Sequence, residues 1–143
     1  MRILIAILII LAGLMLYVRL APTNIDRWHT RPTATEPRDQ RDEGGFTAVR
    51  RMTAPAAEVL AALEQRALAT PRTRLLAGSV GEGLLTFQTR SLVWGFPDHT
   101  TVAVEGDLLI AYGRLRFGRR DMGVNRARIL GWIESLGPLT EPL

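Results

Sequence analysis

The 143-residue sequence contains no cysteine and no lysine, so all 18 of its basic residues are arginine. Without cysteine it offers no disulfide, no cysteine zinc site, no thiol nucleophile and no cysteine for lipid attachment. Without lysine it has no Schiff-base former, no P-loop lysine and no lysine general base. These two absences exclude a large share of covalent and nucleotide-dependent enzymes.

Histidine and serine are scarce and poorly placed for catalysis. The only histidines, His29 and His99, have no carboxylate at ligand spacing, whereas a zinc or iron site needs three or four converging donors. Ser79, Ser91 and Ser135 lie outside any nucleophile-elbow pattern, and no paired carboxylates occur for acid–base work. We therefore assign no catalytic residue, no metal site and no cofactor.

The charge balance is basic, with a formal net charge of +4. It favours an acidic partner, either phospholipid or nucleic acid, although GC-rich coding also produces arginine-rich chains. Trp94 and Tyr112 are not spaced as a stacking platform, so we expect no nucleic-acid partner.

A long apolar run opens the chain. Residues 3–18 carry no charge. At ~1.5 Å per residue, residues 3–21 extend roughly 28 Å, enough to cross the bilayer if Arg19 snorkels. The alternative is a secretory signal that begins at Arg2, but Arg19 occupies a position where a cleavage site needs a small residue, and Pro22 lies just beyond. The pattern favours an uncleaved transmembrane anchor in contact with the lipid bilayer.

Two features of the anchor point to opposite orientations. Arginines on the C-terminal side of the segment, namely Arg19, Arg27, Arg31 and Arg38, favour a domain on the cytoplasmic side. The very short N-terminal tail is instead typical of a signal-anchor that exports the domain attached to its C-terminal end. We expect a single-pass inner-membrane protein with a periplasmic domain.

Residues 22–45 differ in composition from the rest of the chain. They contain Pro22, Pro32 and Pro37, many charges and a closing pair of glycines, and they show no hydrophobic period. We interpret them as a tether near the bilayer, with Trp28 and His29 either at the interface or packed back on the domain.

Residues 46–137 show the patterns of one folded domain. Period-two alternation and turn signals predict strands over residues 46–52, 72–77, 84–93, 100–105 and 108–117, with Asp98 closing a turn before the fourth strand. Helical spacing predicts helices over residues 55–69 and 122–136, the second with Met122, Ile129, Ile133 and Leu136 inward. We expect an α+β fold in which an antiparallel sheet of about five strands carries both helices on one face.

An arginine-rich segment lies between residues 114 and 128. Its basic residues are Arg114, Arg116, Arg119, Arg120, Arg126 and Arg128, against the single acid Asp121. Such a cluster at a strand-to-helix corner suits a phosphate, a carboxylate or a lipid headgroup. The alternative is a solvated surface on which Asp121 caps the helix and pairs with a neighbouring arginine.

Two ordered segments carry a family resemblance. Residues 90–98 (RSLVWGFPD) and 116–129 (RFGRRDMGVNRARI) resemble the signature of the bacterial domain-of-unknown-function family numbered 1499. The resemblance covers residues 46–136 and implies an N-terminal membrane segment or export signal, but no activity. The family pattern usually has serines where this chain has Leu115 and Arg120, and often an acid where it has His99.

Five residues form the candidate ligand-binding site. Arg90, Asp98, Arg116, Asp121 and Asn125 are expected to converge at one end of the sheet, because the strands and turns that carry them are joined there. Both carboxylates are expected to stay ionised among the arginines. The cluster is either a binding cleft or a salt-bridge network that only locks the corner.

These features favour a non-enzymatic binding or assembly module of the cell envelope. Its partner is either an envelope protein or an anionic ligand that bears a lipid or phosphate group. The alternative is an enzyme in which Asp98 and Arg116 act on a phosphorylated or lipidic substrate.

Overall fold

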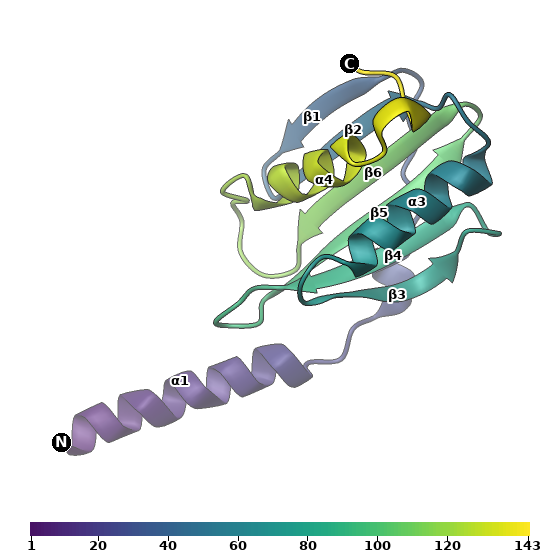
Figure 1. Cartoon of the computed structure of the whole chain (residues 1–143). Helices are drawn as coiled ribbons and strands as arrows, with labels where there is room; N and C mark the ends of the chain where they lie inside the picture. Colours follow the sequence, from purple (N-terminus) through teal and green to yellow (C-terminus); the bar gives the residue numbers. More distant parts are fainter.

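The computed structural model describes all 143 residues and shows a six-stranded antiparallel sheet preceded by a long helix (Figure 1). The elements are α1 (Arg2–Leu20), α2 (Ile25–Trp28), β1 (Arg38–Asp42), β2 (Gly45–Arg51), α3 (Ala56–Leu68), β3 (Thr73–Ser79), β4 (Leu84–Arg90), β5 (Pro97–Glu105), β6 (Leu108–Leu115), α4 (Val124–Glu134) and a 3₁₀ turn (Gly137–Leu139). The strand order is β1-β2-β6-β5-β4-β3. The predicted α+β class is confirmed, with six strands in place of about five.

Helices α3 and α4 lie side by side on one face of the sheet and enclose the main core (Figure 1). Alternate residues of the strands point toward them, as Leu85 and Phe87 do on β4. Trp132 of α4 meets Phe87 edge to face at 5.6 Å between ring centroids. Close packing of α4 depends on Gly113 of β6, where an added Cβ would stand 2.8 Å from Ile129. The space between this sheet face and the two helices is therefore the apolar interior. It is formed by every second residue of the strands and by one apolar side of each helix.

The strands around residues 91–97 differ from the sequence prediction. β4 ends at Arg90 and β5 already begins at Pro97. Gly95 has φ of 74°, a left-handed conformation that reverses the chain and leaves Val93 exposed. The prediction that Asp98 closes a turn was wrong, because Asp98 lies within β5 opposite Leu115.

The start of the last helix also differs. α4 begins at Val124, after Gly123 in a left-handed conformation. Met122 was predicted to point inward, but it lies before the helix and is 95% exposed. Ile129, Ile133 and Leu136 are buried as predicted.

Residues 22–45 were predicted to be a tether, but most of them pack on the folded domain. The segment 21–36, here called the strap, crosses the sheet face opposite the helices, and Trp28 stacks on His99 of β5 at 4.2 Å between ring centroids. Arg31 donates hydrogen bonds to the carbonyls of Glu82, Gly83 and Val104, at 3.0–3.2 Å. Strand β1 then pairs with β2 along its whole length. The ordered domain therefore starts well before residue 46.

Helix α1 extends away from the domain (Figure 1). It is apolar on all sides, and of its residues only Val18 is buried. By length and composition it is the one helix able to cross a membrane, and a signal sequence near an N-terminus meets the same description.

Candidate functional site

All five residues of the predicted site lie at the end of the sheet that adjoins α1, but on two different faces. Arg90 is opposite Pro97 in the register, and the backbone N–H of Arg116 donates to the carbonyl of Pro97 at 3.4 Å. Since side chains alternate along a strand, Asp98 points to the helix-covered face whereas Arg90 and Arg116 point to the strap side. Asp121 and Asn125 join Asp98 on the helix side.

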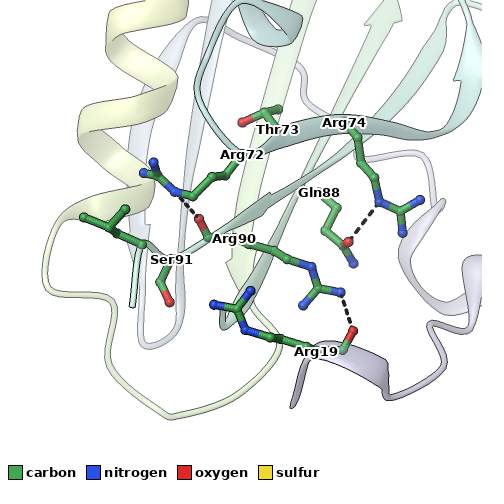
Figure 2. A pocket seen from close by; sticks show the side chains of 8 residues that line it. Arg19, Arg72, Thr73, Arg74, Gln88, Arg90 and Ser91 are labelled. Carbon is green, nitrogen blue, oxygen red and sulfur yellow. Dashed lines mark hydrogen bonds between the residues drawn. The ribbon is translucent and has the colours of Figure 1, made fainter. Parts of the chain in front are cut away.

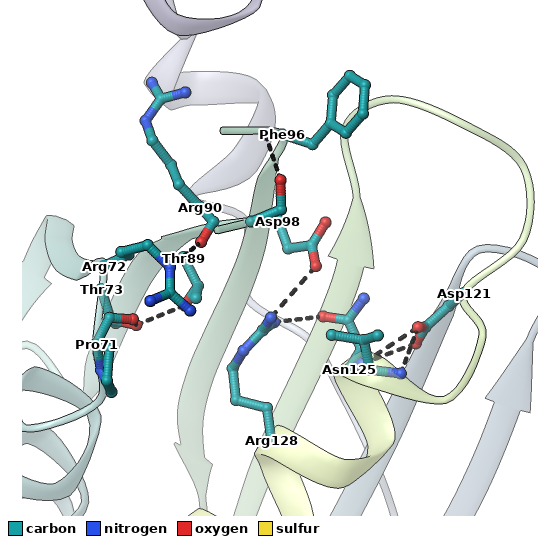
Figure 3. A network of polar contacts seen from close by, with 12 residues as sticks. Pro71, Arg72, Thr73, Thr89, Arg90, Phe96, Asp98, Asp121, Asn125 and Arg128 are labelled. Atoms are coloured by element: carbon teal, nitrogen blue, oxygen red, sulfur yellow. Dashed lines mark hydrogen bonds and ion pairs between the residues drawn. The ribbon is translucent and has the colours of Figure 1, made fainter. Parts of the chain in front are cut away.

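On the helix side, Asp98, Arg128, Asn125 and Asp121 form a polar corner beneath the first turn of α4 (Figure 3). Arg128 donates to Asp98 Oδ2 at 3.3 Å and to Asn125 Oδ1 at 3.0 Å. Asp121 accepts hydrogen bonds from the backbone N–H groups of Val124, at 2.8 Å, and Asn125, at 3.0 Å. These contacts are internal, so the corner holds the start of α4 in place.

Burial governs the ionisation of Asp98. Removal from water raises the pKa of its carboxyl group, the charge and hydrogen bond of Arg128 lower it, and the nearby Asp121 raises it further. The net direction is upward, whereas the sequence led us to expect a fully ionised acid among arginines. Arg128 is thus the single group that makes a buried carboxylate tolerable here.

On the strap side, Arg90 and Arg116 hold the end of α1 and the beginning of the strap. Arg90 donates to the carbonyls of Val18 at 3.3 Å, Arg19 at 3.2 Å and Gly95 at 2.8 Å. Arg116 donates to the carbonyl of Pro22 at 2.7 Å and to Thr23 Oγ1 at 3.1 Å. A cation among the last carbonyls of a helix satisfies acceptors that have no partner within it. The two arginines therefore fix the domain against the end of α1.

Beside this junction lies a basic cleft of about 370 Å³ (Figure 2). Its lining contains four arginines and one hydrophobic residue; the full set is Arg19, Arg72, Thr73, Arg74, Gln88, Arg90, Ser91 and Leu92. None of the four guanidinium groups has a carboxylate within 4.0 Å. Arg72 donates to the carbonyl of Arg90 at 3.0 Å and Arg74 to Gln88 Oε1 at 3.1 Å, which leaves most of their donors unused.

The charges of the basic cleft are uncompensated. Burial lowers the pKa of Arg90, and the like charges of Arg74, Arg19 and Arg116 lower it further. An anion placed in the cleft would relieve this repulsion and accept the unused N–H groups. The arrangement suits a phosphate or carboxylate group.

Sequence reasoning missed Arg19, Arg72 and Arg74 as members of one cleft. Arg74 lies in β3, whereas Arg72 precedes the strand in a left-handed conformation with φ of 57°, so strand alternation does not relate their side chains. Their approach to each other depends on this turn, and their approach to Arg19 depends on how the end of α1 docks against the sheet. No group of three or more His, Asp or Glu side chains is placed to hold a metal ion.

Comparison with known proteins gives a family but no annotated relative. No curated protein matches the chain. A family model described as "Protein of unknown function (DUF1499)" matches residues 26–136. The match starts within α2 and includes Trp28, the rest of the strap from residue 26 onward, and all six strands. On this match over most of its length, the chain belongs to the DUF1499 family.

Proposed function

We propose that the chain is a membrane-anchored, non-enzymatic binding module of the cell envelope, and that its basic cleft holds a phosphate-type anion. The observation that carries this proposal is the set of four arginines in one cleft, without a carboxylate partner, beside the end of an apolar helix. If α1 spans the bilayer, its C-terminal end lies at the depth of lipid headgroups. Arginines near a membrane surface attract anionic lipids there.

The contacts at the end of α1 support an anchor that is retained. Val18 is 3% exposed, and its carbonyl accepts a hydrogen bond from Arg90. Cleavage after the apolar run would remove these contacts and one of the four cleft arginines. The length and composition of α1 support a single membrane span, and we propose that the attached domain lies in the periplasm.

Protease treatment of intact spheroplasts tests this location. We expect the protease to digest the domain in intact spheroplasts, because the domain faces the outside. In fractionation without protease, we expect the protein to remain with the membrane fraction. A domain protected in spheroplasts but digested in lysates would reverse the orientation, and full-length protein in the soluble fraction would contradict the anchor.

A binding role has more support than catalysis by Asp98 with Arg116. The carboxylate of Asp98 pairs with Arg128 under α4, whereas Arg116 binds the strap on the other side of the sheet. An acid and a cation separated in this way do not share a substrate atom. An envelope protein partner would have to present a carboxylate or phosphate to the same cleft.

Titration of the full chain in nonionic detergent micelles tests the anion site. Calorimetry measures the binding of three probes, namely dihexanoyl phosphatidylglycerol, dihexanoyl phosphatidylcholine and inorganic phosphate. We expect the double variant Arg72→Gln/Arg74→Gln to bind phosphatidylglycerol about tenfold more weakly, because two lost charge-assisted contacts at an exposed site remove about 1–2 kcal/mol. Binding of phosphatidylglycerol but not of phosphate would identify a headgroup site, and equal binding would identify a free-anion site.

The matched control is Arg41→Gln, which removes an exposed arginine on β1 that makes no ion pair. It should bind like the unaltered chain. Equal weakening in the control and in the Arg72/Arg74 double variant would show that only net charge matters and would contradict the proposed site.

A further inference from the structure

The loop between β4 and β5, residues 91–96, displays apolar side chains to solvent; we call it the apolar loop. Leu92 is 72% exposed and Val93 is 61% exposed, and Trp94 and Phe96 are each more than a third exposed. A soluble domain rarely presents consecutive large apolar residues in this way. The feature therefore points to a surface that contacts something apolar.

The apolar loop is held in one shape by its own hydrogen bonds. Ser91 and Phe96 bond to each other twice, N–H of Ser91 to the carbonyl of Phe96 at 3.0 Å and N–H of Phe96 to Ser91 Oγ at 2.9 Å. The rings of Trp94 and Phe96 stack with centroids 6.4 Å apart. Exposure of Leu92 and Val93 thus belongs to an ordered loop and not to a frayed one.

The apolar loop lies against the end of α1. Arg19 donates to the carbonyl of Val93 at 3.0 Å, and a Cβ added to Gly95 would stand 3.0 Å from the Arg19 side chain. Arg90 binds the carbonyls of both Gly95 and Val18. Figure 1 shows this end of the sheet beside the end of α1 that joins the domain. The apolar loop and the apolar surface of α1 are consequently neighbours.

We propose that the apolar loop is a second membrane contact, which inserts Leu92, Val93 and Trp94 into the interfacial layer of the bilayer that α1 crosses. This inference rests on the proposed anchoring by α1. Because α1 and the loop are joined through Arg19 and Arg90, a bilayer around α1 brings the loop to the same surface. The domain would then be fixed to the membrane at two points.

Three features favour a bilayer over a protein as the occupant. The exposed apolar surface continues onto α1, of which only Val18 is buried. Tryptophan is enriched in the interfacial layer of membranes, where its ring contacts apolar groups and its N–H remains hydrated. Next to the loop lies a hollow of about 400 Å³ in which five of nine lining residues are hydrophobic, among them Phe96, Phe117 and Met122, and this apolar part suits an acyl chain; Arg120, Asp98 and Asp121 are among the polar lining residues.

Single-cysteine labelling tests the insertion cleanly, because the chain has no cysteine of its own. Leu92→Cys and Leu143→Cys each replace an exposed leucine, the second at the C-terminus far from α1 (Figure 1). Each full-length variant is labelled with an environment-sensitive fluorophore and reconstituted in phosphatidylcholine nanodiscs. We expect a blue-shifted label at position 92 that is quenched by brominated acyl chains, and a label at position 143 that is quenched only by aqueous iodide.

Tryptophan emission supplies an independent readout. Trp28 and Trp132 are buried, so Trp94 is the tryptophan most open to a quencher. Quenching by brominated lipid should be lost in Trp94→Phe. A label at position 92 that iodide quenches as readily as the label at position 143 would overturn the inference, and so would a label shielded from both quenchers, because a protein or a second copy would then cover the loop.

The labelling experiment on the apolar loop and the titration of the anion site can fail independently of each other. Insertion of apolar side chains needs no anionic lipid, so the loop is tested in neutral phosphatidylcholine. If the Arg72/Arg74 double variant binds phosphatidylglycerol normally while position 92 is lipid-quenched, the anion site fails and the second membrane contact stands. Failure of the chain to reconstitute in nanodiscs at all would contradict the anchoring by α1 and overturn the second membrane contact with it.

Discussion

Arg128→Met is expected to lower the free energy of unfolding by about 3–5 kcal/mol at neutral pH, because it leaves a buried carboxylate without its counter-ion. Arg128 is the one cation paired with Asp98, and its side chain and that of Asp98 are 11% and 12% exposed. It also satisfies Asn125 Oδ1, while Asn125 Nδ2 already lacks a partner. Denaturant unfolding of the full chain in detergent micelles measures the loss.

The matched control is the double variant Asp98→Asn/Arg128→Met. Removing the charge along with its partner should restore much of the lost stability. The deficit of the single variant relative to the unaltered chain should shrink as the pH is lowered, because the pKa of Asp98 is raised and its carboxyl group takes up a proton. Equal losses in the single and double variants at every pH would show that packing of the Arg128 side chain matters and its charge does not.

The second large effect is a loss of stability in acid caused by His99. Burial, and then the charges of Arg114, Arg116, Arg90 and Arg74, lower the pKa of its imidazole to about 3 from an ordinary value of 6.5. The unfolded chain binds a proton near pH 6.5, whereas the folded chain stays neutral at this residue down to about pH 3. The free energy of unfolding should therefore fall by about 1.4 kcal/mol for each unit of pH below 6.5.

The contribution of His99 is read as a difference from His99→Gln. Glutamine carries no titrating group and retains a hydrogen-bonding side chain opposite Gln88. The raised pKa of Asp98 acts in the opposite direction, stabilising the fold as pH falls, but it is common to both proteins and cancels. Parallel profiles between pH 4 and 7 would contradict a depressed pKa at His99.

Elements with a regular apolar period were predictable from the sequence. Helix α3 buries one side, and every second residue of strands β2, β4 and β6 that faces the helices is apolar, as Phe46 and Ala48, Leu85 and Phe87, and Leu109 and Ala111 are, so periods of 3.6 and 2 are visible in the residue types. Strand β1 was not predictable, because it reads RDQRD and lies at the edge of the sheet. Its pairing comes from backbone contacts with β2, which charged side chains do not signal, and charges on an edge strand deter further strand addition.

The candidate site was predictable in part for a related reason. Turn positions and strand ends place Arg90, Asp98 and Arg116 at one end of the sheet. Which face each side chain takes depends on strand boundaries and on the register, and β5 begins at Pro97, several residues earlier than expected. A strand boundary that shifts so far changes which residues meet, so the sequence could not separate the basic cleft from the Asp98 corner.

The order of strands in space also sets an order in time. β3, β4, β5 and β6 are successive neighbours both along the chain and in the sheet, so each can pair as soon as its successor has been synthesised. β1 and β2 are also neighbours along the chain and in the sheet, but the partner of β2 on its inner side is β6, more than fifty residues downstream by their register. During synthesis we therefore expect β1 and β2 to stay outside the sheet until the last strand arrives, although they precede the other strands in the chain.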